Sequence, residues 1–97
     1  MIAYSFHPDA EAELAEAADY YEARRPGLGK IFAAEVTRTI SLIREYPDSG
    51  APVGASRRRM LVRRFPYTIV YRQDGDSLLV VAVAHQSRRP GYWRGRR

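Results

Sequence analysis

Residues 65–85 read FPYTIVYRQDGDSLLVVAVAH, and this stretch determines the fold class. The segment 67–72 is rich in aromatic and β-branched residues, and the segment 78–84 is apolar at every position. Both patterns are typical of β-strands, and the Asp74-Gly75 pair between them is the strongest short-range signal for a hairpin turn. An apolar run without alternation indicates a strand covered on both faces, so we expect residues 78–84 to form the central strand.

Weaker strand patterns lie on the N-terminal side of this hairpin. Residues 57–65 alternate weakly and predict the preceding strand, while Pro66 forces a corner or an edge position between the two. Residues 48–56 hold two glycines and a proline and are predicted to form a loop. At the start of the chain, residues 2–6 alternate between larger and smaller side chains, which predicts a short strand.

A first helix is predicted to begin at residues 7–9 and to end at residues 24–27. Proline suits the first helical position, an acidic residue favours the positive end of the helix dipole, and cations followed by a breaker close the other end. One face is apolar and is formed by Ala10, Leu14, Ala17 and Tyr21. The opposite face is mostly acidic and we expect it to be exposed; it carries Glu13, Glu16 and Asp19.

A second amphipathic helix is predicted from about Leu28 to Tyr46, where Pro47 stops it. Its apolar stripe consists of Leu28, Phe32, Val36, Ile40 and Ile43, widened by Ile31 and Leu42. Because only a few residues connect the two helices, we expect them to pack as an antiparallel hairpin. The order β-α-α-β-β-β indicates an α+β fold, with residues 1–97 forming a single domain.

Composition restricts the class of protein. Hydrophobic residues are 45% of the chain and aromatic residues 11%, which is enough for a packed core. Cysteine is absent and there are two histidines, so we expect neither disulfides nor a metal site, and no cofactor. The N-terminus lacks the basic segment of a signal peptide, and the longest apolar run is too short to span a bilayer. We therefore expect a cytoplasmic protein with no membrane partner.

Charge is distributed unevenly along the chain. Residues 1–50 carry 5 basic and 9 acidic side chains, a net charge of −4, whereas residues 51–97 carry 11 basic and 2 acidic side chains, a net charge of +9. Every basic residue except Lys30 is arginine. Guanidinium groups bind phosphates and carboxylates in bidentate fashion, so the basic half indicates a polyanion or an acidic protein surface as partner. A genome rich in guanine and cytosine would also favour arginine codons, but it would not segregate the charges.

Short motifs follow one another in a fixed order along nearly the whole chain. They are Phe6-His7-Pro8, Asp19-Tyr20-Tyr21-Glu22, Gly27-Leu28-Gly29, Tyr46-Pro47, Phe65-Pro66-Tyr67, Val81-Ala82-Val83-Ala84-His85, Arg88-Arg89-Pro90 and Tyr92-Trp93. This ordered set resembles the RelE/ParE superfamily of type II toxins, many of which are labelled plasmid-stabilisation proteins. The resemblance implies a helical hairpin packed on one face of a small twisted antiparallel sheet. It also implies a cognate, often acidic antitoxin that wraps and neutralises the toxin in a hetero-oligomer.

The resemblance leaves two activities open. RelE-like members cleave mRNA on the ribosome, whereas ParE-like members inhibit DNA gyrase without being nucleases. Metal-free RNA cleavage needs a base, an acid and cations, which His85, Tyr92 and Arg63 could supply. A histidine that closes a strand more often caps a loop or packs against its neighbours.

The second strand of the family's pattern separates these activities. RelE-like sequences carry lysines or a glutamate there, whereas this chain has five arginines between residues 57 and 64 and no carboxylate between Pro52 and Gln73. Guanidinium cannot readily act as a base. We therefore favour a ParE-like gyrase inhibitor over an endoribonuclease; a third possibility is a member that retains antitoxin binding with little toxicity.

Candidate binding residues lie on the arginine-rich strand and on the C-terminal tail. They are Arg57, Arg59, Arg63, Arg64, Arg88, Arg89, Tyr92 and Trp93. The strand arginines could instead guard an exposed edge against aggregation. Basic and aromatic residues together are typical of nucleic-acid contact, but we expect Trp93 to fold back onto the sheet. We expect exposure for Arg94, Arg96 and Arg97.

Overall fold

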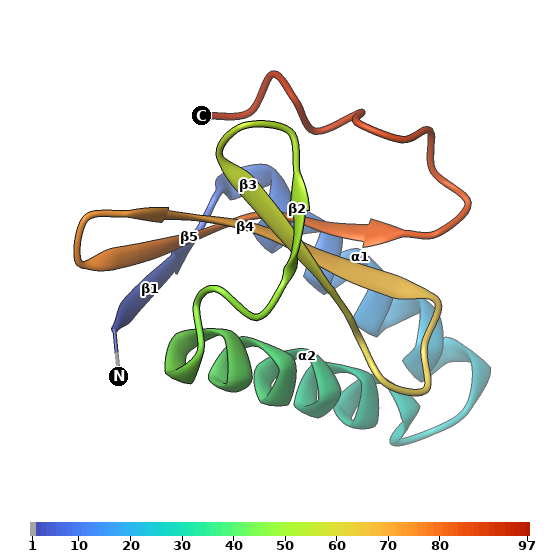
Figure 1. Cartoon of the computed structure of the whole chain (residues 1–97). Helices are drawn as coiled ribbons and strands as arrows, with labels where there is room; N and C mark the ends of the chain where they lie inside the picture. Colours follow the sequence, from blue (N-terminus) through green and yellow to red (C-terminus); the bar gives the residue numbers. More distant parts are fainter. Residues whose placement is uncertain (1) are drawn as a thin grey trace.

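The computed structural model describes residues 2–97 as a five-stranded mixed sheet with two helices. The elements in chain order are β1 (Ala3–Phe6), α1 (Pro8–Arg24), α2 (Leu28–Glu45), β2 (Ala51–Val53), β3 (Arg57–Leu61), β4 (Tyr67–Asp74) and β5 (Ser77–His85). The strand order is β1-β5-β4-β3-β2, with β1 and β2 at the two edges (Figure 1). The α+β class and the element order predicted from the sequence are confirmed, with β2 as an additional short strand.

The β4–β5 hairpin forms the middle of the sheet. Its turn lies at Gly75 and Asp76, and Gly75 has a positive φ of 59°, a conformation that glycine adopts without steric cost. The hairpin predicted from the Asp74-Gly75 pair is therefore confirmed. The middle strand is β4 rather than β5, but β5 lies between β4 and β1 and is buried over most of its length, as its apolar sequence predicts.

Three details of the sheet differ from the sequence-based expectation. Strand β1 pairs with β5 in parallel, so the sheet is mixed and only β2–β5 are antiparallel. The two helices return the chain to the end of the sheet where β1 stops, so β2 runs against β1, and the three reversals from β2 to β5 bring β5 into the direction of β1. Strand β2 lies inside the predicted loop 48–56. Strand β3 ends at Leu61 instead of continuing to Phe65, because Arg64 adopts a positive φ of 71° and turns the chain.

A β-bulge in β5 determines which face of the sheet each of its side chains lies on. Val70 pairs with Ala82 and Tyr71 with Val80, so Val81 has no partner on β4. The extra residue shifts the alternation, and Val80 and Val83 consequently belong to the same cluster of buried residues. The shift also sets the direction of the side chains that follow at the end of the strand.

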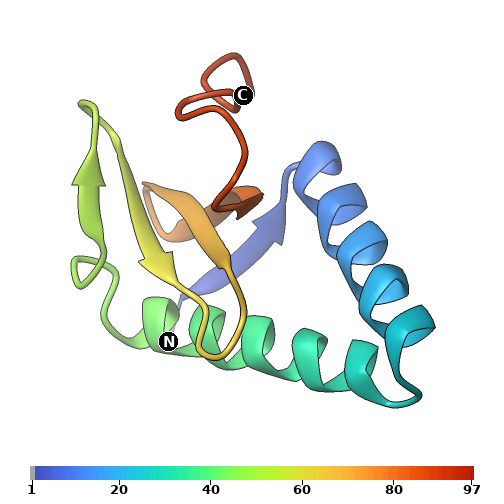
Figure 2. The same ribbon diagram turned by 90° about the vertical axis from the view of Figure 1, so that its right-hand side faces the viewer.

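The sheet has a different cover on each face. The face toward the helices, here called the helix face, carries the larger core, built around Phe32, Ile40, Ile69, Tyr71 and Leu78. The opposite face, here called the tail face, carries a smaller cluster of Val70, Val81, Ala82, Ala84 and Trp93. Figure 2 shows this division, with α2 below the sheet, α1 to its right and the C-terminal segment above it.

The two helices meet at their connection and then diverge, with the sheet in the angle between them (Figure 2). The antiparallel helical hairpin predicted from the short connection is therefore present, with an open angle between the two helices (Figure 2). The predicted stripe of α2 is buried from Phe32 to Ile43, but Ile31 and Leu42 remain 37% and 42% exposed and do not widen it. Neither side chain belongs to the core cluster or to the partly buried residues packed against it.

A carboxylate from α1 fixes the junction of the helices. Glu22 accepts hydrogen bonds from the backbone N–H groups of Gly27 (2.8 Å) and Gly29 (3.0 Å), two of the unpaired donors at the start of α2. A Cβ at Gly29 would lie 2.5 Å from the Ala18 carbonyl oxygen, so glycine is required for this close approach of the helices. These contacts explain why Glu22 and the Gly27-Leu28-Gly29 motif occur together.

Candidate functional site

The C-terminal tail, residues 86–97, folds back over the tail face of the sheet (Figure 1). Trp93 is 6% exposed, which confirms the predicted fold-back of its ring. The guanidinium of Arg57 lies 5.4 Å from the centre of the Trp93 ring and donates to the carbonyl oxygens of Arg96 (2.9 Å) and Arg94 (3.5 Å). Arg57 thus fixes the tail to β3 and is unavailable as a freely exposed cation.

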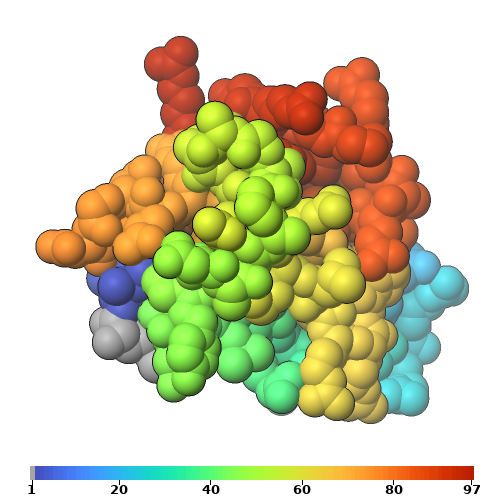
Figure 3. Space-filling view, in the orientation of Figure 1, coloured from blue at the N-terminus to red at the C-terminus, as the bar shows by residue number. Residues whose placement is uncertain are grey.

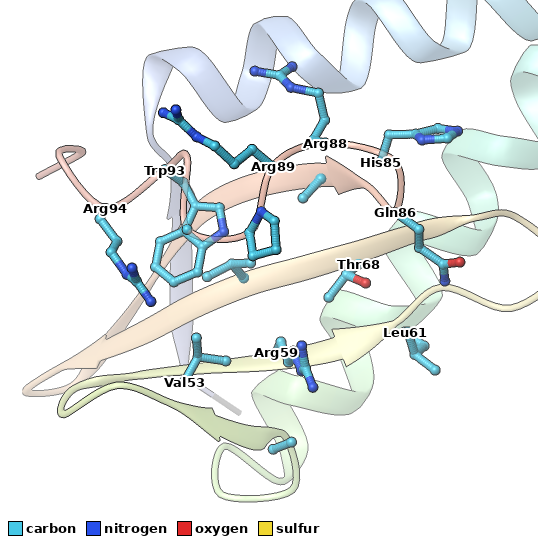
Figure 4. A pocket seen from close by; sticks show the side chains of 15 residues that line it. Val53, Arg59, Leu61, Thr68, His85, Gln86, Arg88, Arg89, Trp93 and Arg94 are labelled. Atoms are coloured by element: carbon cyan, nitrogen blue, oxygen red, sulfur yellow. The ribbon is translucent and has the colours of Figure 1, made fainter.

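Between the tail and strands β2 and β3 lies an open groove of about 680 Å³ (Figure 4). Figure 3 shows the two sides of this region, the tail in red and the β2–β3 segment in yellow-green, next to each other at the surface. Apolar side chains of the groove are Val53, Leu61, Val70, Ala84 and Trp93. Four arginines contribute to its lining, namely Arg59, Arg88, Arg89 and Arg94.

The predicted binding residues divide into three groups. Arg59, Arg88 and Arg89 line the groove, together with Trp93. Arg57 and Tyr92 instead hold the tail in place.

The remaining pair, Arg63 and Arg64, does not line the groove. Both residues lie beyond the end of β3 and are exposed. A guanidinium nitrogen of Arg64 lies 3.9 Å from a carboxylate oxygen of Glu35 on α2. The two arginines therefore belong to the corner that joins β3 to β4.

The three residues considered for RNA cleavage do not surround a common space. The Nδ1 atom of His85 accepts a hydrogen bond from the Ser87 N–H (2.9 Å), and its ring packs edge-on against Tyr67. Figure 4 shows this ring turned away from the groove. Tyr92 donates its hydroxyl hydrogen to Glu13. Arg63 lines neither the groove nor the smaller pocket that His85 forms with residues of α1, among them Glu13 and Tyr20.

The environment of Tyr92 also limits its use as an acid. Burial of the ring, the hydrogen bond to Glu13 and the negative charge of Glu13 together raise the pKa of the Tyr92 hydroxyl strongly. The hydroxyl therefore keeps its proton under physiological conditions and holds it in the bond to Glu13.

The exposure predicted for Glu13 from the sequence pattern is wrong. Glu13 was expected on the exposed face of α1, but its side chain is 14% exposed and accepts hydrogen bonds from Tyr92, Arg96 and the Val83 N–H. The expected exposure of Arg96 is wrong for the same reason, whereas Arg94 and Arg97 are exposed as predicted. A signal was available, because position 13 follows Ala10 by three residues and precedes Ala17 by four, and so borders the apolar face.

Across residues 2–97, no three histidine, aspartate or glutamate side chains are grouped so that they could hold a metal ion. None of the helices formed by these residues has the length and hydrophobicity needed to span a bilayer.

A helical pair on one face of a small mixed sheet, with an arginine-lined groove on the other face, defines a small α+β protein. Residues 4–90 match the family model described as the ParE toxin of the type II toxin–antitoxin system parDE. The chain therefore belongs to the ParE toxin family.

Individual relatives agree with this assignment. Toxin ParE2 of Mycobacterium tuberculosis, in strains CDC 1551 and H37Rv, is 30% identical over 88 residues, which cover 87% of this chain and 81% of the relative. A solved structure of the chromosomal ParDE system from P. aeruginosa has a similar fold, with a TM-score of 0.70 at 19% identity. That similarity covers 88% of this chain and 96% of the solved chain.

Proposed function

We propose that this protein is a growth-arresting toxin that binds and inhibits DNA gyrase in the cytoplasm and is neutralised by a cognate antitoxin. The observation that carries the proposal is the match to the ParE toxin family along residues 4–90. Within that family, we propose that the protein acts as a binding inhibitor and not as an enzyme.

The hydrogen bonding of the candidate acid and the composition of β3 support binding over catalysis. The Tyr92 hydroxyl donates to Glu13 at 2.6 Å and is not available to a substrate. The strand that carries a base or lysines in RelE-like toxins contains only arginine as a polar residue here. A guanidinium has a pKa above about 12, so it can bind a phosphate but cannot accept its neighbour's proton at neutral pH.

The groove on the tail face is the surface we propose for protein partners. Apolar side chains such as Val70 and Trp93 offer area for burial, and Arg59, Arg88 and Arg89 can bind carboxylates around it. An acidic antitoxin segment with a few apolar side chains satisfies both requirements. Competition for this surface would explain how an antitoxin prevents the toxin from reaching its target.

The test compares the two activities of the superfamily directly. Purified protein is added to DNA gyrase and the supercoiling of relaxed plasmid is measured; in parallel, mRNA is followed on translating ribosomes. We expect loss of supercoiling with intact mRNA, and in cells a DNA-damage response on expression without antitoxin. Cleaved mRNA together with unaffected gyrase would show that the protein is an endoribonuclease instead.

A further inference from the structure

We propose that Glu13 is a positioning residue whose carboxylate holds the C-terminal tail against α1 and β5 and thereby builds the tail side of the arginine-lined groove. The inference rests on the proposed function only in treating this groove as the binding surface. The attachment of the tail itself can be measured without gyrase or antitoxin.

Both carboxylate oxygens of Glu13 are fully engaged. Oε1 accepts from the Val83 N–H (3.0 Å) and from Nη1 of Arg96 (2.8 Å), and Oε2 accepts from the Tyr92 hydroxyl (2.6 Å) and from Nη2 of Arg96 (2.9 Å). The bond to Arg96 is bidentate, which is the strongest geometry for this pair of groups. The Glu13 and Arg96 side chains are each 14% exposed, so water weakens the interaction little. One carboxylate thus joins α1, β5 and two positions of the tail.

The position of this pair follows from the sheet topology. Strand β1 pairs with β5 only from Ser77 to Val80, so the rest of that edge of β5 has no strand beside it. There the Val83 N–H donates to Glu13, and the Val81 carbonyl oxygen accepts from Nη1 of Arg96 (3.1 Å). Buried backbone groups need partners, and here the two side chains take the place of the missing strand. The tail is therefore attached at the edge that the short β1 leaves open.

The same attachment determines the shape of the groove. Tyr92 is the immediate neighbour of Trp93, which lines the groove, and its ring carries the guanidinium of Arg88 at 3.9 Å and that of Arg96 at 5.1 Å from its centre. A Tyr92 ring held by Glu13 thus orients one groove arginine directly and Trp93 through the backbone. Without the carboxylate, Arg96 would be left without its main partner in a largely buried position, which favours release of the tail.

The chain supplies its own reporter and control for this inference. Trp93 is the sole tryptophan, so its fluorescence reports the state of the tail. The test variant is Glu13→Gln, which keeps the size of the side chain and removes its charge. The matched control is Glu16→Gln, since Glu16 lies three residues further along α1, is exposed and has no hydrogen bond or ion pair with residues 2–97.

In Glu13→Gln we expect Trp93 emission at longer wavelength and stronger quenching by acrylamide, with unchanged far-ultraviolet circular dichroism. The amides of Arg94 and Arg96, which close turns in the tail, should exchange with solvent about 10- to 100-fold faster, while amides of the β4–β5 hairpin keep their protection. Glu16→Gln should behave as the parent. Adding Arg96→Gln to Glu13→Gln should loosen the tail less than Arg96→Gln does in the parent, because the charged bond between Glu13 and Arg96 is already lost.

Parent-like Trp93 emission and tail exchange in folded Glu13→Gln would overturn the proposal. If Glu13→Gln does not fold, Tyr92→Phe decides, because it removes one of the bonds from the tail side: a loosened tail supports the proposal and an unchanged tail contradicts it. Gyrase inhibition is measured separately on the same variants. If a variant with a released tail still inhibits gyrase, the groove is not the surface that binds gyrase. The role of Glu13 in holding the tail would not be affected by that result.

Discussion

At the scale of single residues, hydrogen-bond partners decide which polar side chains remain available for function. His85 and Tyr92 are the two groups whose chemistry suits acid or base catalysis; the Tyr92 hydroxyl is bonded to Glu13, whereas His85 is bonded to Ser87 through Nδ1 only. Arg57 is similarly occupied by the tail, whereas Arg59 and Arg89 lie in the groove without an ion pair to any of residues 2–97. Residue type alone does not distinguish these cases.

The variant His85→Gln tests whether a proton must move. Glutamine keeps a hydrogen-bond acceptor for Ser87 and a similar size, so a toxin that acts by binding should remain nearly as toxic as the parent. Loss of a general acid or base would lower the rate by about 100- to 10,000-fold. Growth arrest is measured after induction without antitoxin. A folded His85→Gln protein that binds antitoxin but no longer arrests growth would restore the ribonuclease hypothesis.

The pH dependence of tail attachment follows from Glu13. Burial by itself would raise the pKa of this carboxyl, but hydrogen bonds from Arg96, Tyr92 and the Val83 N–H outweigh burial, and the pKa is lowered from its ordinary value of 4.5. A lowered pKa in the folded state means stability that is present above pH 4.5 and is lost as the pH falls through the folded value.

We therefore expect Trp93 emission to be constant between neutral pH and about pH 5, and to shift below the ordinary glutamate value. Asp9 is a second carboxylate beside Arg96, 3.7 Å from its guanidinium, so the transition must be assigned by mutation. The transition should disappear in Glu13→Gln and persist in Asp9→Asn. Persistence in Glu13→Gln would assign it to another group.

At the scale of elements, hydrogen bonds from Tyr71 and Arg58 connect the segment between α2 and β3 to the sheet. The hydroxyl of Tyr71 on β4 donates to the Pro47 carbonyl oxygen (2.7 Å) and accepts from the Gly50 N–H (3.0 Å). A Cβ at Gly50 would collide with this hydroxyl, so only glycine at this position allows the backbone to lie this close to Tyr71. Arg58 adds a bond to the Gly50 carbonyl oxygen (2.8 Å). These bonds place β2, and hence one side of the groove, beside β3.

Tyr71→Phe should lower the free energy of unfolding by about 1–3 kcal/mol, because it leaves the buried Gly50 N–H without an acceptor. Tyr46→Phe is the control, since Tyr46 is 59% exposed and should give a change within about 0.5 kcal/mol. Chemical denaturation of both variants gives the two values. Equal stabilities would mean that water replaces the lost hydroxyl.

At the scale of the whole molecule, the charge segregation along the chain becomes a segregation between faces. The acidic half of the sequence supplies both helices, which cover the helix face, and the basic half supplies most of the sheet and the tail. Acidic residues of the helices pair with two arginines of the basic half: Glu13 and Asp9 with Arg96, and Glu35 with Arg64. Neither arginine lines the groove, and the groove arginines Arg59 and Arg89 have no ion pair with any of residues 2–97.

Association with an acidic partner should depend on salt and on the groove arginines. Replacing Arg59 and Arg89 by glutamine should slow association with the antitoxin more than it speeds dissociation, and the difference should shrink at high ionic strength. Arg63→Gln is the comparison, since Arg63 is exposed but lies outside the groove lining. Association kinetics at two salt concentrations give the answer; an equal effect of all three substitutions would mean that net charge, not the groove, guides the encounter.

Local sequence patterns determined most of the elements of this protein. The apolar run of β5, the Asp74-Gly75 turn and the stripe of α2 each depend on residues close in sequence, so their strand, turn and helix could be predicted from the chain alone. The fold-back of Trp93 was predicted in the same way, because a large apolar ring in a basic tail favours burial.

Only the tertiary structure decided which polar residues are occupied and which are free. Strand β2 is too short to show a period, and the parallel pairing of β1 depends on where the two helices return the chain. The burial of Glu13 depends on Tyr92 and Arg96, which lie about 80 residues away in sequence. A charged residue at the border of an apolar stripe is predicted to be exposed unless its partner is known. Only the complete fold brings that partner next to it.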